Sequence, residues 1–317
     1  MRQLNKGRSD LSQPLLVSRR DLLRLALGAG ALAFTGGVAM AASIIQRPIP
    51  RTGESLPVIG LGTWQTFDVG NRQSQREPLK AVLRDFVRLQ GKVIDSSPMY
   101  GNSETVVGDL AAELGVQKQL FLATKVWTSG REAGIRQMEE SFRRLRTPVM
   151  DLMQVHNLVD WQTHLTTLRR WKEQGKVRYI GVTHYTASAY DQLARVLGTE
   201  DLDFVQLNYS IVEREAENRL LPLAADKRIA VLVNRPFAAG GLFSKVRSNP
   251  LPSWAKEIGC ASWAQFLLKF VISHPAVTCA IPATSKVQHL TDNMQAGIGR
   301  LPDAPMRERM AQYVAKL

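Results

Sequence analysis

Several apolar segments of this chain end in side chains that can move protons. Asp95, Lys125 and His156 each stand at or near the end of such a segment, and Tyr100 follows Asp95 in the first of the connecting loops. If the segments are neighbouring parallel strands, these side chains meet at one edge of the sheet. A carboxylate, a phenol, an ammonium and an imidazole can together protonate an oxygen that gains negative charge.

These residue types have complementary roles in such a reaction. A free phenol has a pKa near ~10, which is too high for ready proton donation at neutral pH. A cation such as Lys125 favours the phenolate and is expected to lower the pKa of Tyr100. Asp95 would hold Lys125 in place and compensate its charge, and His156 would hydrogen-bond the substrate oxygen. Each residue alone is as compatible with a structural role, so the inference depends on the whole set.

The segments that position these residues alternate along the chain. Short apolar runs rich in β-branched residues each precede a longer amphipathic stretch. The predicted strands are 58–63, 93–95, 120–126, 152–156, 179–182, 204–207, 229–233 and 277–281. The predicted helices lie near 79–83 and over 103–114, 130–145, 161–173, 187–197, 216–226, 263–273, 287–296 and 306–315.

This alternation predicts an α/β fold of the (β/α)8 TIM-barrel type, which typically takes about 250 residues as one domain. A doubly wound sheet is the alternative, but Gly60-x-Gly62 lacks the third glycine and the helix start of the dinucleotide-binding fingerprint. In a barrel, catalytic residues lie at the carboxyl ends of the strands, which is where the polar set stands. Residues 42–317 are therefore predicted to form one barrel.

The order and spacing of these motifs resemble the aldo-keto reductase family. The resemblance extends over residues 50–317 and rests on the run Asp95-x4-Tyr100-Gly101-x-Ser103-Glu104, followed by Lys125 and His156 at the family's separations. It implies that Asp95, Tyr100, Lys125 and His156 form a catalytic tetrad. It also implies an enzyme that reduces a small-molecule aldehyde or ketone with a nicotinamide cofactor. The alternative is a cofactor-binding regulatory or sensing barrel with little turnover.

By the same resemblance, residues after the later strands bind the nicotinamide. Thr183 and His184 occupy the positions of the family's Ser-Asn pair, and Gln206 that of its carboxamide-binding Gln. His184 is a departure, because a neutral imidazole cannot satisfy both functions of an amide at once. Asn234 stands where many members carry the aromatic side chain that stacks on the nicotinamide. Arg235 is expected to stack in its place or to bind the pyrophosphate.

The segment after the last strand resembles the family's adenosine-phosphate site. Lys286, with the hydroxyls of Thr284 and Ser285, is expected to meet a 2′-phosphate, which favours NADPH, with NADH as the alternative. Trp64 and Trp127 are expected to wall a pocket for an apolar carbonyl substrate. The other residues assigned to the cofactor are Gly62, Thr63, His289 and Asn293.

Residues 1–41 have the features of an export segment. The run Ser18-Arg19-Arg20-Asp21-Leu22-Leu23 resembles a twin-arginine (Tat) signal, and Ala39-Met40-Ala41 fits a signal-peptidase site. These features predict export of the folded protein to the periplasm by the Tat machinery. The alternative is an uncleaved anchor, because the uncharged run 25–45 is long enough to span a bilayer. No other contact with a membrane is expected.

The chain has a net charge of +13; residues 1–41 hold six bases and two acids, so the rest of the chain carries +9. The basic residues are spread along predicted helices without interleaved aromatic residues, so nucleic-acid binding is not expected. The histidines lack metal-ligand spacing, so no metal is expected. Cys260 and Cys279 are expected to be two separate buried thiols.

Overall fold

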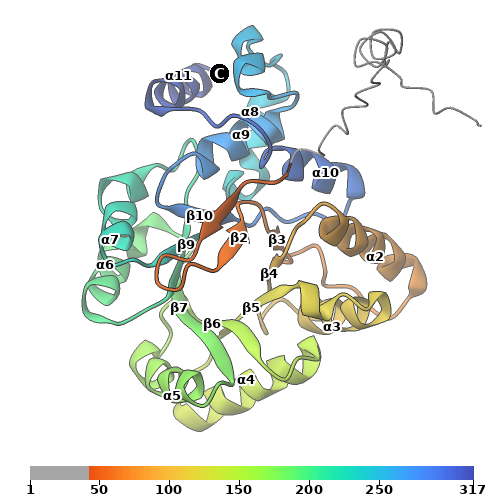
Figure 1. The fold of residues 1–317 in the computed structure, drawn as a ribbon, viewed down its shortest axis with the longest axis vertical. Coiled ribbons are helices and arrows are strands. Elements are labelled where there is room, and N and C mark those ends of the chain that lie inside the picture. Colours follow the sequence, from red (N-terminus) through yellow and green to blue (C-terminus); the bar gives the residue numbers. More distant parts are fainter. Residues whose placement is uncertain (1–42) are drawn as a thin grey trace, which may run out of the picture. The chain divides into compact units, whose positions relative to one another are not determined.

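Eight parallel strands follow one another in chain order within a single sheet (Figure 1). They are β3 (Leu61–Gly62), β4 (Val93–Asp95), β5 (Phe121–Val126), β6 (Met150–His156), β7 (Val177–Thr183), β8 (Phe204–Asn208), β9 (Ala230–Asn234) and β10 (Val277–Ala280). The structure, a computed structural model, describes residues 43–317. The predicted export segment, residues 1–41, lies outside the described residues.

The two edges of this sheet are joined, so the sheet closes into a barrel. The Gly60 N–H donates to the Ala280 carbonyl at 2.8 Å, and the Ala280 N–H donates to the Val58 carbonyl at 2.9 Å. Gly60 also permits a close approach to β4 on its other side, because a Cβ there would lie 2.8 Å from the Val93 carbonyl oxygen. Of the predicted strand 58–63, only β3 keeps a regular ladder. The predicted (β/α)8 fold is confirmed.

Helices surround the sheet (Figure 1). In α4, Met138 and Leu145 are seven residues apart on one face and are buried, whereas Arg143 is largely exposed. The short helix α8, which follows β9, was not predicted. Each of the other α-helices overlaps a predicted helix. The helices are α2 (Gln73–Arg88), α3 (Ser103–Leu114), α4 (Arg131–Leu145), α5 (Trp161–Glu173), α6 (Tyr190–Thr199), α7 (Leu220–Asp226), α8 (Gly241–Val246), α9 (Trp263–Ile272), α10 (Val287–Gln295) and α11 (Ala304–Ala315).

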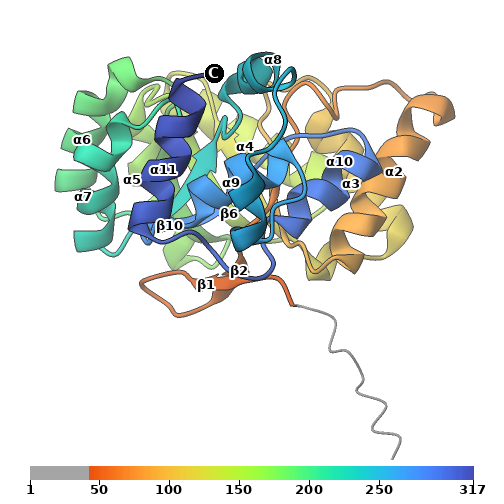
Figure 2. The ribbon, with the colours of Figure 1, turned by 90° about the horizontal axis from the view of Figure 1, so that it is seen from above.

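A β-hairpin that the sequence pattern did not predict covers the amino-terminal end of the barrel. Its strands, β1 (Gln46–Pro48) and β2 (Ser55–Pro57), pair antiparallel, and Figure 2 shows them at the end opposite to α8. Ile49 and Leu56 are 0% and 1% exposed. They pack into an apolar cluster inside the barrel with Val93, Phe121, Ala123, Leu152, Tyr179, Phe204, Ala230, Leu232, Cys279 and Ile281. This end of the barrel is closed by apolar packing.

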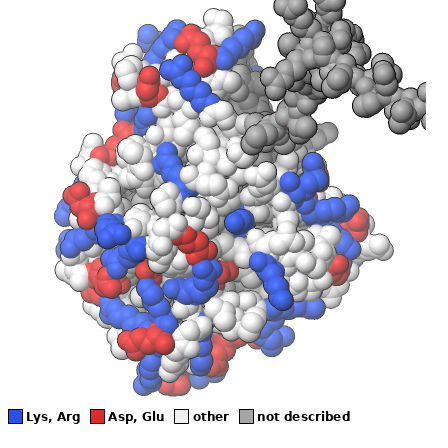
Figure 3. Space-filling view, viewed as in Figure 1, with Lys and Arg blue, Asp and Glu red and all other residues white. Residues whose placement is uncertain are grey.

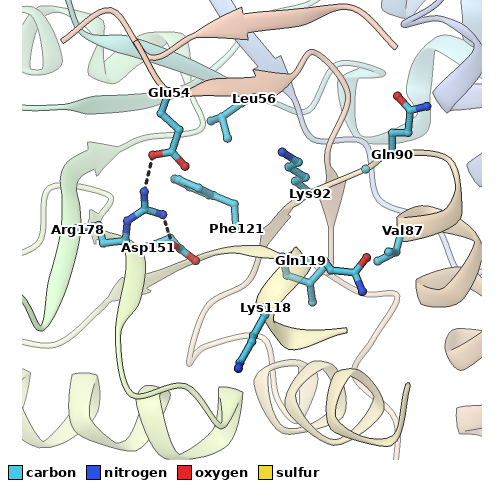
Figure 4. A pocket seen from close by; sticks show the side chains of 12 residues that line it. Glu54, Leu56, Val87, Gln90, Lys92, Lys118, Gln119, Phe121, Asp151 and Arg178 are labelled. Atoms are coloured by element: carbon cyan, nitrogen blue, oxygen red, sulfur yellow. Dashed lines mark hydrogen bonds and ion pairs between the residues drawn. The ribbon is translucent and has the colours of Figure 1, made fainter. Parts of the chain in front are cut away.

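The closed end carries a pocket that contains none of the predicted catalytic residues. The pocket has a volume of about 450 Å³ and is lined by the hairpin, by the carboxyl end of α2 and by residues at the starts of β4 to β7 (Figure 4). Arg178 bridges Glu54 and Asp151 there, with Arg178 Nη1 2.6 Å from Asp151 Oδ1. Both carboxylates are therefore paired with the same guanidinium.

Charged side chains of both signs are mixed on the face shown in Figure 3. Many of those on the described surface form ion pairs between neighbouring elements, such as Arg76–Asp109 at 2.8 Å. Such mixing is typical of a solvated surface. Cys260 and Cys279 are free and buried, as predicted. No helix among residues 43–317 is long and apolar enough to cross a membrane.

Candidate active site

The predicted catalytic side chains meet at the carboxyl end of the barrel. β4 ends at Asp95, β5 carries Lys125, β6 ends at His156, and Tyr100 lies in the loop between β4 and α3. The three strands are neighbours in the sheet. The rings of Tyr100 and His156 meet edge-on with centroids 6.0 Å apart. Lys125 Nζ lies 5.0 Å from the centroid of the Tyr100 ring. The structure therefore brings the four residues into one site.

A buried ion pair between Asp95 and Lys125 forms the base of this site. Lys125 Nζ donates to Asp95 Oδ2 at 2.7 Å and to the Ser96 carbonyl at 2.6 Å, and the paired side chains are 0% and 4% exposed. Burial lowers the pKa of the Lys125 ammonium, but Asp95, followed by Tyr100, raises this pKa by more. The net pKa lies above its ordinary value, so Lys125 is charged at neutral pH.

Two glutamine side chains hold the other oxygen of Asp95. Gln206 Nε2 donates to Asp95 Oδ1 at 2.7 Å, and Gln154 Nε2 donates to the same atom at 3.3 Å. Gln206 was predicted to bind the cofactor, whereas Gln154 was not singled out. The signal for Gln154 is its place two residues before His156, since alternate residues of a strand share a face. Asp95 is thus held in position at both oxygens.

The loop after β4 presents Tyr100 beside this ion pair. The Tyr100 N–H donates to the Ser97 carbonyl at 3.0 Å and closes a turn. Gly101 continues the loop at φ +58°, where a Cβ would lie 2.2 Å from the Asp68 carboxylate. Burial raises the pKa of the Tyr100 phenol, and the Lys125 charge lowers it by less. The prediction of a lowered phenol pKa is wrong for the protein alone, because burial outweighs the cation.

His156 enters the site as a neutral imidazole. Its side chain is 6% exposed, and burial, followed by the charges of Lys125 and His184, lowers its pKa to about 2. A neutral imidazole carries one N–H and one acceptor nitrogen. Ser97 Oγ, which was not predicted to belong to the site, lies 3.2 Å from His156 Nδ1.

Side chains predicted to bind the nicotinamide form a connected group next to Asp95. Gln206 Oε1 accepts from Thr183 Oγ1 at 3.3 Å and from Asn234 Nδ2 at 3.4 Å. Asn234 Nδ2 also lies 3.1 Å from the His184 carbonyl. Within residues 43–317, Asn234 Oδ1 is buried and has no hydrogen-bond partner. It is therefore an acceptor suited to the N–H of a ligand amide.

The side chains of His184 and Arg235 gather around Tyr185, which sequence reasoning did not single out. The His184 ring stacks on the Tyr185 ring, with centroids 5.6 Å apart and planes 4° apart. The Arg235 guanidinium lies 5.9 Å from the Tyr185 ring, and its Nη1 donates to the Tyr185 carbonyl at 3.3 Å. Tyr185 is 47% exposed. Arg235 thus makes a cation–π contact at the rim of the open end.

Of the residues predicted to bind the adenosine phosphate, Thr284, Ser285, Lys286 and His289 lie at the amino terminus of α10, whereas Asn293 lies near its carboxyl end. The Lys286 N–H donates to Thr284 Oγ1 at 3.1 Å. Thr284 and Asn293 are buried, whereas Ser285, Lys286 and His289 are exposed. A helix amino terminus attracts anions, and lysine and hydroxyl groups add donors to it. This set of donors fits a phosphate group.

Gly62, Thr63, Trp64 and Trp127 lie at the same end of the barrel. Thr63 is fully buried with its Oγ1 3.0 Å from the Asp95 carbonyl. A Cβ on Gly62 would lie 2.7 Å from the carbonyl oxygen of Ile281, the residue after β10. Gly62 and Thr63 therefore support the strand ends. Trp64 and Trp127 are 46% and 42% exposed, and the Trp127 ring lies 6.4 Å from that of His156. No group of His, Cys, Asp and Glu side chains that could hold a metal ion occurs among the described residues.

Comparisons with known proteins agree with this architecture. The family model described as "Aldo/keto reductase family" matches residues 58–310. Methylglyoxal reductase YeaE of Escherichia coli (strain K12) is 32% identical over 256 residues, covering 78% of this chain and 88% of the relative. An NADH-specific methylglyoxal reductase of the same organism is 29% identical over 243 residues, covering 66% and 72%. An aldo/keto reductase from Klebsiella pneumoniae, solved with NADP and acetate, superposes with a TM-score of 0.69 at 28% identity, covering 83% of this chain and 93% of that one.

Proposed function

The chain belongs to the aldo/keto reductase family, and from this premise we propose that it is an NADPH-dependent enzyme that reduces an aldehyde or ketone to the alcohol. The observation that carries the proposal is the buried Asp95–Lys125 pair against Tyr100 and His156. Relatives named methylglyoxal reductases and a structural neighbour in complex with NADP support the same chemistry. The NADH-specific relative makes NADH the alternative cofactor.

We infer a task for each of these side chains. The cofactor, when bound, supplies the hydride that reduces the carbonyl carbon. Tyr100 gives its phenolic proton to the carbonyl oxygen as negative charge develops there. Lys125 stabilises the phenolate that remains, which matters because burial alone keeps the pKa of Tyr100 high. His156, as a neutral imidazole, donates a hydrogen bond to the same oxygen, and Asp95 fixes Lys125.

The residues at the ends of β7, β8 and β9 and at the start of α10 would hold the cofactor. Asn234 Oδ1, buried without a partner among the described residues, fits the carboxamide N–H. Lys286, exposed beside Thr284, fits a phosphate and supports the preference for NADPH. The exposed Trp64 and Trp127 at the opening fit the apolar part of a carbonyl substrate.

The test has two parts, both made on the purified full-length chain. NADPH binding is monitored by fluorescence, and NADPH oxidation is measured in the presence of a carbonyl substrate. Methylglyoxal and an activated aromatic aldehyde are the substrates, and NADH is the matched alternative cofactor. We expect stoichiometric alcohol formation and tighter binding of NADPH than of NADH. Binding without turnover of any carbonyl would contradict the reductase and favour a regulatory or sensing barrel.

We further propose that residues 1–41 direct export of the folded protein to the periplasm by the Tat machinery. The paired Arg19-Arg20 and the uncharged run after Arg24 support this proposal. Because the barrel would fold before transport, the cofactor would be bound in the cytoplasm and carried along. Cell fractionation should place the chain in the periplasm and a variant with Arg19→Lys and Arg20→Lys in the cytoplasm. Equal distribution of the two would contradict export, and recovery of uncleaved chain in membranes would favour the anchor.

A further inference from the structure

Ser97 touches both of the groups that the proposed mechanism directs at the substrate oxygen. Its carbonyl accepts the Tyr100 N–H at 3.0 Å and so closes the turn that carries the phenol. Its hydroxyl oxygen lies 3.2 Å from His156 Nδ1. Ser97 is fully buried, so water does not compete for these contacts. One residue thus links the turn of the proton donor, through its backbone carbonyl, to the imidazole, through its hydroxyl.

The surroundings of the Ser97 hydroxyl decide which group donates. The Met99 N–H donates to Ser97 Oγ at 3.4 Å, so the oxygen already acts as an acceptor. Among the described residues, His156 Nδ1 is the one partner placed to receive the hydroxyl hydrogen. If Nδ1 carried a proton, Ser97 Oγ would receive two N–H groups and its own hydrogen would be left without a partner. A buried donor without a partner costs free energy, so the favoured arrangement has Ser97 donating to Nδ1.

We propose that Ser97 is a positioning residue that holds His156 in the tautomer with its proton on Nε2. The inference rests on the proposed function, in which the carbonyl oxygen accepts a hydrogen bond from His156. With the proton on Nδ1, Nε2 would present a lone pair to the carbonyl oxygen and repel it. Within residues 43–317, His156 Nε2 makes no hydrogen bond, and it is not buried, so a ligand can reach it. It is therefore the nitrogen left for the substrate.

The choice of tautomer decides whether His156 can donate a hydrogen bond to the substrate, because burial and the nearby Lys125 keep the ring neutral. Because they lower the pKa of His156 to about 2, the doubly protonated ring is absent at neutral pH. The imidazole therefore has one proton to place, and a wrong placement removes the hydrogen bond altogether. The expected loss for a neutral hydrogen bond of this kind is about 3- to 10-fold in kcat/KM.

The experiment is ¹⁵N NMR of the full-length chain labelled at histidine nitrogens, with His156 assigned from the spectrum of His156→Gln. We expect a protonated Nε2 and an unprotonated Nδ1 in the wild-type protein. In Ser97→Ala, we expect both nitrogen shifts to move toward values typical of mixed tautomers. We also expect kcat/KM to fall by about 3- to 10-fold with NADPH affinity unchanged. The matched control is Ser96→Ala, because Ser96 is equally buried but its Oγ accepts from Thr63 at 3.0 Å; its His156 shifts should equal those of the wild type.

A wild-type proton on Nδ1 would overturn the assignment, and so would Ser97→Ala with unchanged shifts and unchanged kcat/KM. Equal shift changes in Ser96→Ala and Ser97→Ala would also overturn it, because the effect would then come from the turn as a whole. Absence of turnover in the wild-type chain would contradict the proposed function alone, since the nitrogen shifts are read without substrate.

Discussion

The two ends of the barrel use the same strands for opposite purposes. β5 begins with Phe121 in the apolar cluster and carries Lys125 in the site four residues later. β6 carries Leu152 in the cluster and ends at His156. Because alternate residues of a strand share a face, each of these pairs points into the barrel. A distance of four residues therefore separates a side chain that stabilises the fold from one that is placed for chemistry.

This difference indicates which end stabilises the protein and which end costs stability. Apolar burial at the closed end, with Ile49 and Leu56 of the hairpin fully covered, lowers the free energy of the folded state. At the open end, a buried ion pair must be desolvated, and Gln154 Oε1 and Asn234 Oδ1 lack partners among the described residues. Functional sites commonly carry such costs, and the rest of the fold compensates for them.

The largest combined effect on activity and stability is expected from Lys125→Met, which removes the cation from the open end. Without Lys125, the phenolate of Tyr100 is not stabilised, so kcat should fall by about 10²- to 10³-fold. Asp95 is left buried without its partner, so the free energy of unfolding should fall by about 3–5 kcal/mol. Turnover assays and urea unfolding measure the two effects. A wild-type kcat in this variant would show that Lys125 takes no part in the reaction.

A comparable loss of stability without loss of chemistry is expected from Phe121→Ala at the closed end. The cavity left by the ring should lower the free energy of unfolding by about 3–5 kcal/mol. Because the side chain lies away from the tetrad, kcat of the folded protein should stay within about twofold of the wild type. Phe121→Leu, which fills most of the space, is the matched control and should be less destabilising. A large drop in kcat with unchanged stability would break the division between the two ends.

A smaller effect is expected from pH, through His156. Its pKa is about 2 in the folded protein against 6.5 as the ordinary value, so below pH 6.5 the unfolded chain takes up a proton that the folded chain does not. The stabilisation is fully present above pH 6.5 and is lost as the pH falls toward the folded value. Between pH 7.5 and pH 5, the wild type should lose about 2 kcal/mol more than His156→Gln in free energy of unfolding. Parallel pH profiles of the two proteins would contradict a buried neutral imidazole.

The barrel and the meeting of the four polar side chains at one of its ends were predictable because both follow from what ends each strand. That these four residues form a catalytic tetrad was implied by the resemblance to the family and stays a prediction. Asp95 and His156 are polar residues at the ends of apolar runs, and that signal needs no knowledge of packing. The hairpin β1–β2 and the helix α8 were missed because they are too short for a periodic pattern and, unlike the equally short strand 93–95, have no place in the alternation of strands and helices. Their places are set by tertiary contacts.

The finer features of the site depend on which side chains face one another across strands. Ser97 was missed because its contact with His156 joins two different strand ends, which spacing along the chain does not reveal. The pKa of Tyr100 was predicted in the wrong direction because burial is a property of the folded protein. The export segment 1–41 and the cofactor roles of the strand-end residues remain predictions.

The most direct test of the division between the two ends is Tyr100→Phe, which removes one oxygen atom from the site. The measurement is single-turnover NADPH oxidation with a saturating aldehyde, made beside NADPH affinity and urea unfolding on the same preparation. The account predicts a loss of about 10²- to 10⁴-fold in the rate of reduction, with NADPH affinity and stability close to those of the wild type. A rate equal to that of the wild type would contradict Tyr100 as the proton donor and the open end as the place of the chemistry.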